Sequence, residues 1–394
     1  MKTVKSLLLG SAAALVVITG VQAADLPVAE PVEYVKVCST YGEGFFYIPG
    51  TNTCLQISGR ARTDLYVTGN ADKRDNEDST EWDIRGNIAA DARSETEWGT
   101  LRSYVELEGR VDPSDNEGNS VTLEEGFVQF AGVTVGFAQS FYDFVEYSFV
   151  NDIFSDEKVA QAAYTAAFGS GFSATIAIEN RGDREVDNDL YGSQTWPNAV
   201  AAIRIDQAWG SAQLSGALQQ NRTNADFAGD TDSKLAWAAQ AGIAVNLPFF
   251  GTEGSKWWVQ GAYTQGALSY IGGEDAFGNT PNGNLDNGDF LVGDFAVDAD
   301  GDIHQTTAYA VGTGFALQWS PTVVTSIGGY YAHLDQKGTG NPNAKYYQGL
   351  LNTTWTPVEN LDLGVEVFYS KLDIAGDAPN DHVWGAVGRV ERHF

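Results

Sequence analysis

The stretch Leu361-Asp-Leu-Gly-Val-Glu-Val-Phe-Tyr369 decides the fold of this chain. Every odd-numbered residue in it is apolar or aromatic, whereas Asp362, Gly364 and Glu366 occupy even-numbered positions. The side chains of a β-strand point alternately to its two faces. The stretch therefore predicts a strand with one apolar face and one largely polar face.

The same alternation recurs from Tyr309 to Trp319 and from Trp384 to Phe394, so that aromatic residues stand ten positions apart at both ends of each run. About ten tilted strand residues cross the hydrocarbon core of a membrane, and aromatic side chains collect at its two interfaces. These runs predict strands of an all-β, antiparallel transmembrane barrel in the bacterial outer membrane.

The N-terminus has the features of a secretory signal peptide, assigned to residues 1–23. Lys2 and Lys5 make it positive, residues 7–17 form an apolar core, and Val21-Gln-Ala23 is a small-residue cleavage site. Because no later stretch reaches roughly 18 apolar residues, the exported chain can enter a membrane only as a closed barrel.

Sixteen segments of the mature chain are predicted to be strands. They are 54–68, 79–93, 100–110, 121–131, 133–139, 158–168, 172–179, 198–208, 211–221, 234–247, 256–271, 305–318, 322–335, 345–355, 361–373 and 382–394. Short turns alternate with long loops between them, as in bacterial barrels. We divide the chain into a signal peptide (1–23), an extended segment with a hairpin (24–54) and a barrel (55–394). A soluble β-sandwich or β-helix would also alternate, but it would not explain the signal peptide and the paired aromatics.

The chain is strongly acidic. Its formal net charge is −29, and removal of Lys2 and Lys5 with the signal peptide makes it −31. This charge argues against nucleic acid as a partner, because such binding needs a basic surface. It suits an aqueous lumen that attracts cations, or acidic loops that face lipopolysaccharide through bridging divalent ions.

The two cysteines, Cys38 and Cys54, are predicted to form a disulfide that closes residues 39–53, because an even pair in an exported chain is typically oxidised. The alternative is a reactive or metal-binding pair. No histidine or further cysteine lies close in sequence to complete a zinc site.

The long segment 140–157 is unusual for a loop because it carries many aromatic and aliphatic residues. We expect it to fold inward as the third outer loop, with its acidic residues turned to the pore. These are Asp143, Glu146, Asp152 and Asp156. The alternative is a surface loop with exposed aromatics.

Four arginines lie on the polar faces of the first three predicted strands: Arg60, Arg62, Arg85 and Arg102. Because arginine stays charged, a row of them on the facing wall would hold a transverse field across a pore. With the acidic excess, this arrangement predicts weak to moderate cation selectivity. The alternative is that each arginine merely pairs with a carboxylate in the lumen.

No enzymatic, metal or cofactor site is predicted. Asp298-Ala-Asp300-Gly-Asp302 begins like a calcium loop, but Ile303 and Tyr309 stand where an EF-hand needs glycine and glutamate, so a solvated acidic loop is favoured over calcium binding. The histidines show no triad or metal-ligand spacing. They are His304, His333, His382 and His393.

Several motifs resemble one family. They are Val32-Glu-Tyr-Val-Lys-Val-Cys38, Tyr41-Gly, Phe46-Tyr-Ile-Pro-Gly50-Thr, Phe127-Val-Gln-Phe-Ala-Gly132, Gln139-Ser-Phe-Tyr-Asp-Phe144 and Arg389-Val-Glu-Arg-His-Phe394. The chain is similar in these motifs to alphaproteobacterial porins of the Rhizobium–Brucella type. The likeness implies a sixteen-stranded trimeric porin whose loop after the fifth strand folds into the pore. The chain departs from the wider porin pattern at Arg392, where an aromatic residue is common.

The expected function is passive diffusion of small hydrophilic solutes and ions across the outer membrane. Two alternatives remain: a solute-selective channel, for instance for sugars, and an adhesin or structural protein that uses the long loop 272–304. Small residues on the outward faces of the first two strands, with the family likeness, predict a homotrimer packed through these strands. These residues are Ala61, Gly86, Ala90 and Ala92.

Overall fold

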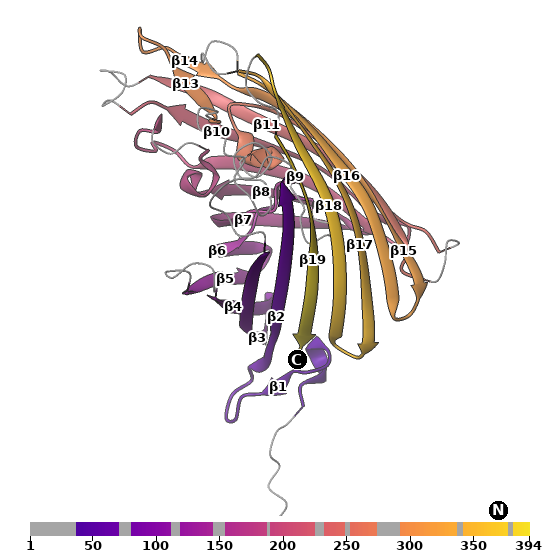
Figure 1. Cartoon of the computed structure of the whole chain (residues 1–394). Coiled ribbons are helices and arrows are strands. Elements are labelled where there is room, and N and C mark those ends of the chain that lie inside the picture. The colour runs from indigo at the N-terminus through magenta and orange to yellow at the C-terminus, as the bar shows by residue number, and fades with distance from the viewer. Residues whose placement is uncertain are drawn as a thin grey trace, which may run out of the picture. The chain divides into compact units, whose positions relative to one another are not determined.

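Sixteen long antiparallel strands form one closed sheet in the computed structural model, and the short strand β1 (Phe46–Tyr47) pairs with the first of them (Figure 1). The long strands are β2 (Cys54–Asn70), β3 (Thr80–Thr96), β4 (Gly99–Val111), β5 (Ser120–Phe130), β6 (Val133–Gln139), β7 (Lys158–Gly169), β8 (Phe172–Glu179), β9 (Asn198–Gln207), β10 (Gly210–Arg222), β11 (Ser233–Asn246), β12 (Lys256–Gln265), β15 (Thr307–Ser320), β16 (Val323–Asp335), β17 (Ala344–Val358), β18 (Leu361–Ile374) and β19 (Asp381–His393). The predicted all-β barrel of sixteen strands is confirmed.

The structure describes ten ranges of the chain. They are residues 37–70, 80–111, 119–144, 154–186, 190–224, 232–248, 253–273, 292–336, 342–376 and 381–394. All of them belong to one compact unit, Val37–Phe394. The predicted signal peptide (1–23) and residues 24–36 lie outside the described residues.

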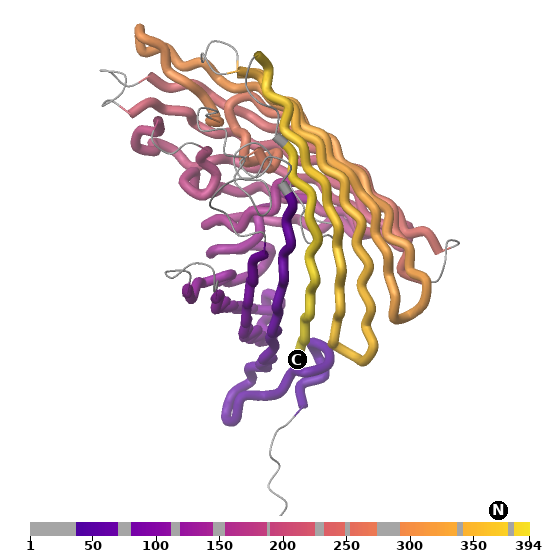
Figure 2. Tube along the Cα trace, in the orientation of Figure 1, coloured from indigo at the N-terminus to yellow at the C-terminus, as the bar shows by residue number. Residues whose placement is uncertain are grey.

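The first and last strands of the barrel close it edge to edge. The ladder between β2 and β19 runs from Arg60 opposite His393 to Asn70 opposite Val383. Beyond it, backbone hydrogen bonds of 3.1 and 3.0 Å join Gly59 to Phe394. Indigo β2 and yellow β19 accordingly run side by side in Figure 2. Every long strand therefore has a partner on both sides, which a barrel in lipid requires.

The apolar face of the sheet points outward and its polar face points inward, which is the reverse of a soluble barrel. On β18, Val365 is 59% exposed, whereas Glu366 on the opposite face is 0% exposed. The aromatics Tyr309, Trp319 and Trp384 are also exposed on the outer face. An apolar outer band of this extent is stable only against lipid, because exposure of apolar surface to water costs about 25 cal/mol per Å².

Short turns join the strands at one end of the barrel. Ala131 and Gly132 connect β5 to β6 with φ angles of 50° and 84°, as a two-residue primed turn requires. A Cβ atom on Gly132 would lie 2.7 Å from the carbonyl oxygen of Thr165, so this position needs glycine.

Most predicted strand boundaries lie within three residues of the observed ones, but the predicted strand 256–271 is too long. β12 ends at Gln265, and Gly266 turns the chain inward with a φ of 75° while its N–H donates to the Thr306 carbonyl at 2.7 Å. The apolar residues that follow form the buried 3₁₀ helix η4 (Leu268–Ile271). They pack inside the barrel instead of extending its wall.

The end of the predicted long loop 272–304, together with Gln305, forms a small hairpin that the sequence did not indicate, β13 (Phe295–Val297) paired with β14 (Ile303–Gln305). The segment that resembled a calcium loop is its turn. The Asp298 carboxylate accepts the N–H groups of Asp300 and Asp302 at 2.9 and 3.0 Å and lies 2.8 Å from Nε2 of His304. The acidic sequence is thereby explained by turn formation.

The remaining regular elements are short. In the ranges that the structure describes, they are the 3₁₀ helices η1 (Ser39–Tyr41) and η2 (Arg181–Arg184). Among the described residues, no helix has the length and apolar character needed to span a bilayer. The predicted disulfide is confirmed: Cys38 and Cys54 are bonded, with their Cα atoms 5.9 Å apart.

Candidate functional site

An arginine wall lies on the inner face of β2, β3, β4 and β19. The four predicted arginines belong to it, and their side chains are 11–30% exposed, toward the barrel interior. They alternate along the strands with exposed apolar residues such as Ile57 and Ile84, which face outward. The structure therefore brings the predicted residues Arg60, Arg62, Arg85 and Arg102 together on one wall.

Carboxylates of the same strands lie beneath these arginines. The pairs are Arg60–Glu108 at 3.7 Å, Arg62–Asp64 at 3.3 Å, Arg85–Asp83 at 2.6 Å and Arg102–Asp91 at 3.0 Å. Asp64 and Asp83 are almost completely buried, so the guanidinium groups form the layer nearest the interior. The wall is thus a positive surface over a negative underlayer.

Sequence reasoning missed three further arginines of this wall, Arg93, Arg110 and Arg389. Arg93 pairs with Asp91 at 2.6 Å, and Arg389 joins β19 to β2 through Asp64 at 2.7 Å. The strand alternation could have found two of them, because Arg93 follows Arg85 by eight residues and Arg110 follows Arg102 by eight. An even spacing keeps both members of a pair on one face.

The four predicted acidic residues are placed differently from one another. Asp143 is 6% exposed and accepts hydrogen bonds from Gln139 Nε2 at 2.7 Å and from the Glu157 N–H at 2.8 Å. Asp156 is exposed. Glu146 and Asp152 lie outside the described residues.

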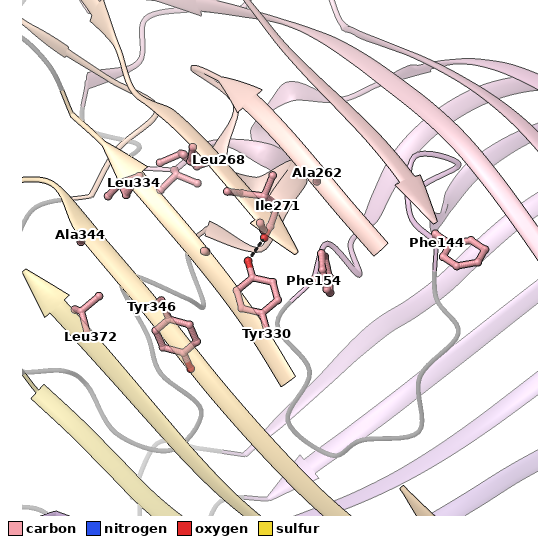
Figure 3. Packing of buried hydrophobic residues seen from close by; sticks show 14 of the residues in the cluster. Phe144, Phe154, Ala262, Leu268, Ile271, Tyr330, Leu334, Ala344, Tyr346 and Leu372 are labelled. Carbon is pink, nitrogen blue, oxygen red and sulfur yellow. Dashed lines mark hydrogen bonds between the residues drawn. The ribbon is translucent and has the colours of Figure 1, made fainter. Parts of the chain in front are cut away.

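Both described ends of segment 140–157 contact inward-facing residues of the opposite wall. The Tyr142 carbonyl accepts hydrogen bonds from Ser215 Oγ at 2.7 Å and Gln240 Nε2 at 2.9 Å. Phe154 packs edge to face on Tyr330, with ring centroids 4.8 Å apart (Figure 3). These contacts explain the apolar character of the segment.

A fully buried ionic group, the Arg184 cluster (Arg184, Asp143, Ser155, Glu179 and Tyr270), ties these loops to the wall. Arg184 Nη1 donates to Ser155 Oγ at 2.6 Å, Nη2 lies 3.4 Å from Asp143 and Nε lies 3.8 Å from Glu179. The guanidinium also lies 4.4 Å from the ring centroid of Tyr270. The cluster joins segment 140–157, η2, β8 and η4, and no sequence motif indicated it.

A second buried carboxylate, Asp294, joins three more distant segments. Its oxygens accept the N–H of Leu268 at 2.5 Å, the N–H of Val186 at 3.1 Å and the Tyr191 hydroxyl at 2.7 Å. These donors are all uncharged groups. Burial raises the pKa of Asp294 to about 7, although the hydrogen bonds oppose that rise. The Tyr191 ring in turn lies 4.8 Å from the guanidinium of Arg181.

Two cavities follow the arginine wall. One, of about 510 Å³, lies between Arg93 and Arg102 of the wall, Tyr41 of the N-terminal segment and Phe141 of segment 140–157. The other, of about 480 Å³, is lined by residues that include Arg60 and Glu125. The wall therefore borders open space, whereas the inner face of β10–β17 is packed against loops and η4.

One group of side chains in the described residues could hold a metal ion: Asp362, Glu391 and His393. His393 Nε2 lies 2.7 Å from Glu391 Oε1, and Arg60 Nη1 lies 3.7 Å from the same carboxylate. The Arg60–Glu391 ion pair and the contacts of His393 with Glu391 and Asp362 account for this group without a metal.

The comparison with known proteins agrees with this geometry. A family model described as "Porin subfamily" matches residues 25–388. The chain belongs to this porin subfamily. Porin Omp2a of Brucella ovis is 36% identical over 296 residues, which are 67% of this chain and 80% of the relative.

Two solved structures share the fold of this porin. The outer membrane channel DcaP of Acinetobacter baumannii has a TM-score of 0.68 and 18% identity, over 88% of this chain and 99% of the other. The trimer form of OmpT from Vibrio cholerae has a TM-score of 0.52 and 10% identity, over 87% and 100%. The protein is an outer-membrane porin, a channel for passive diffusion and not an enzyme.

Replacing Arg184 should destabilise the porin strongly. The substitution Arg184→Gln leaves Asp143 and Glu179 buried without their cation, and breaking such a pair costs about 3–5 kcal/mol. The free energy of unfolding, measured by urea titration in lipid vesicles, should fall accordingly. The control Lys371→Gln removes a cation from the partly exposed Lys371–Asp373 pair and should change less. Equal effects of both substitutions would contradict a central role for the cluster.

The packing around Asp294 should loosen as the pH rises. Because its pKa is raised to about 7 in the folded porin, from a usual value near 4, the folded state holds the proton more tightly than an opened state does. The stabilisation of the folded state by the protonated Asp294 is fully present below about pH 4 and is lost as the pH rises through 7. Hydrogen–deuterium exchange in residues 292–306, corrected for intrinsic rates, should be faster at pH 8 than at pH 6. Asp294→Asn should abolish that difference, and a persisting difference would disprove the assignment.

Proposed function

We propose that this porin passes small hydrophilic solutes and ions through a narrow passage between the arginine wall and segment 140–157, with a weak preference for cations. The observation that carries the proposal is the cavity of about 510 Å³, which has wall arginines on one side and Phe141 of that segment on the other. A water-filled constriction lined by fixed charge, without a catalytic group, is what diffusion requires.

The anchoring of segment 140–157 supports its role as the constriction loop. Tyr142 and Phe154 pack at its two ends on the wall opposite the arginines, and Asp143 is held by Arg184. Asp143 is therefore an anchor with its charge compensated, and we assign the charge that faces the passage to the exposed Asp156. We propose the same role, a charge that faces the passage, for Glu146 and Asp152.

The charge balance supports a weak selectivity. Each predicted arginine has a carboxylate within 3.7 Å, so the wall contributes a local dipole and little net charge. The acidic excess of the chain, −29 before any cleavage, then decides the sign of the field at the mouth. Because the Debye length at physiological salt is about 8 Å, comparable to a pore radius, these charges act on passing ions.

The reversal potential across a potassium chloride gradient, measured in a planar bilayer, tests this selectivity. Asp156→Asn should reduce the cation preference and Arg60→Gln should increase it, and both effects should fade at high salt. Glu97→Gln, which makes the same charge change in an exposed turn between β3 and β4, is the control and should have a smaller effect. A wild-type channel that prefers chloride, or an unchanged potential in both lumen variants, would refute the proposal.

We also propose that the porin is a homotrimer packed through its first strands. Ala61, Gly86 and Gly109 are register partners across β2, β3 and β4, and Ala61 and Gly86 are exposed on the outer face. A Cβ atom added at Gly86 would meet no other atom within 4 Å. This row leaves a shallow strip in the apolar band where a second barrel can approach closely. The similar fold of OmpT in its trimer form supports the proposal.

A bulky side chain in this strip should separate the trimer. Gly86→Phe is expected to give monomers on native gels and in cross-linking, because the ring would fill the strip. Gly349→Phe is the matched control, since Gly349 is also exposed on the outer face and a Cβ there would also meet no atom within 4 Å. A trimer that survives Gly86→Phe, or a wild type that is monomeric in mild detergent, would exclude this interface.

A further inference from the structure

The N-terminal residues that precede β2 form a small folded unit, the exit hairpin, which comprises Cys38–Cys54. The disulfide-bonded Cys38 and Cys54 form a buried cluster with Phe45. The Cys38 N–H donates to the Phe45 carbonyl at 2.9 Å, and Tyr47 of β1 pairs with Cys54 of β2. The unit is therefore held by the disulfide and by only a few backbone hydrogen bonds.

The exit hairpin is attached to the inner face of β3 where that strand ends. On this face the Tyr41 hydroxyl donates to Glu95 Oε1 at 3.0 Å. On the opposite face of the strand end, Thr53 Oγ1 lies 3.0 Å from Ser94 Oγ. The Arg93 guanidinium lies 5.0 Å from the ring centroid of Phe45 and 5.7 Å from that of Tyr41. Two aromatic rings thus lie over Arg93, the wall arginine nearest the end of β3.

This attachment puts the exit hairpin at the end of the barrel that carries the short turns. β3 and β4 are joined there by residues 97 and 98, and Figure 2 shows the hairpin beside the C-terminus at the same end. In bacterial barrels the short turns lie on the periplasmic side. Tyr41 also lines the cavity of about 510 Å³, together with Arg93, Arg102 and Phe141. The hairpin is therefore part of the passage on its periplasmic side.

We propose that the exit hairpin is a second size filter at the periplasmic exit, in which Tyr41 sets the width and the Cys38–Cys54 disulfide holds it over Arg93. The inference rests on the passage proposed above: a solute that has passed segment 140–157 leaves through the cavity of about 510 Å³, which the Tyr41 ring borders. The filter acts on size, because Tyr41 is uncharged, and it is separate from the ion selectivity assigned above to Asp156 and Arg60.

The contacts of Arg93 explain why the ring of Tyr41 stays in place. Asp91 binds Arg93 at 2.6 Å and Arg102 at 3.0 Å, so both guanidinium groups are fixed on the wall. Arg102 is stacked in turn on Tyr104 and Phe127, 5.2 and 5.1 Å from their ring centroids. The aromatic face of the hairpin therefore rests on a rigid arginine, and the disulfide limits how far the hairpin can swing away from it.

Single-channel recordings with uncharged polymers of graded size test the proposal. The full-length mature porin and its variants are inserted in planar bilayers, and conductance is measured as a function of polymer size. The variants are Tyr41→Ala, Tyr41→Phe, the double variant Cys38→Ser/Cys54→Ser, and Trp98→Ala. Heat-dependent migration on gels verifies that each one is folded. Wild-type porin treated with a reductant, with the freed thiols alkylated, replaces the double variant if that variant does not fold.

Tyr41→Ala and loss of the disulfide should each raise the conductance and shift the size cutoff to larger polymers. Tyr41→Phe should keep wild-type values, because it keeps the ring and loses only the hydrogen bond to Glu95. Trp98→Ala removes an exposed aromatic from the adjoining turn, outside the cavity, and should also leave the cutoff unchanged. The reversal potential of Tyr41→Ala should equal that of the wild type.

A wild-type conductance and cutoff in Tyr41→Ala would overturn the proposal. An unchanged cutoff after reduction, beside a shifted one in Tyr41→Ala, would overturn the role given to the disulfide. A changed cutoff in Trp98→Ala would show that the turn, and not the hairpin, sets the exit. None of these results depends on the sign of the ion selectivity.

Discussion

The constraint on which the whole molecule depends is that a backbone N–H or C=O facing lipid needs a partner within the protein. The pairing of β2 with β19 removes the last free edges and so meets this constraint. Once the ring of strands is closed, a shift of one residue in the register of a strand would turn all side chains of that strand to the wrong face. The polar half of each strand is thereby forced inward, and the arginine wall with its carboxylate underlayer follows from that geometry.

The interior is divided into a packed side and an open side. On the packed side, apolar side chains of segment 140–157 and of η4 cover the amide-rich faces of β10–β17, and the Arg184 cluster joins the loops. On the open side, guanidinium groups border two cavities. Dispersion and hydrogen bonding thus stabilise one half of the lumen, and this leaves the other half free to hold water and ions.

The sequence predicts the strands well because alternation is a local property: Val365 and Glu366 occupy opposite faces whatever else the chain does. The same rule places Arg60 and Arg85 on the inner face and would have placed Arg93 there too. It fails where the chain leaves the wall, as at Gly266, whose turn converts an apolar run into η4. It also cannot reveal Arg184 or Asp294, because their partners lie far away in sequence: Asp143 is 41 residues from Arg184, and Val186 is 108 residues from Asp294.

The seam between β2 and β19 has a consequence for how the barrel is built. It joins residues far apart in the chain, as in the Arg389–Asp64 contact, which spans 325 positions. Such long-range pairing makes folding slow, since loop-closure entropy is lost before any contact across the seam is gained. A chain without its last strand would present unpaired edges at β2 and β18, which lipid does not tolerate. Strands therefore cannot enter the bilayer stably one at a time, and insertion has to be coupled to closure of the ring.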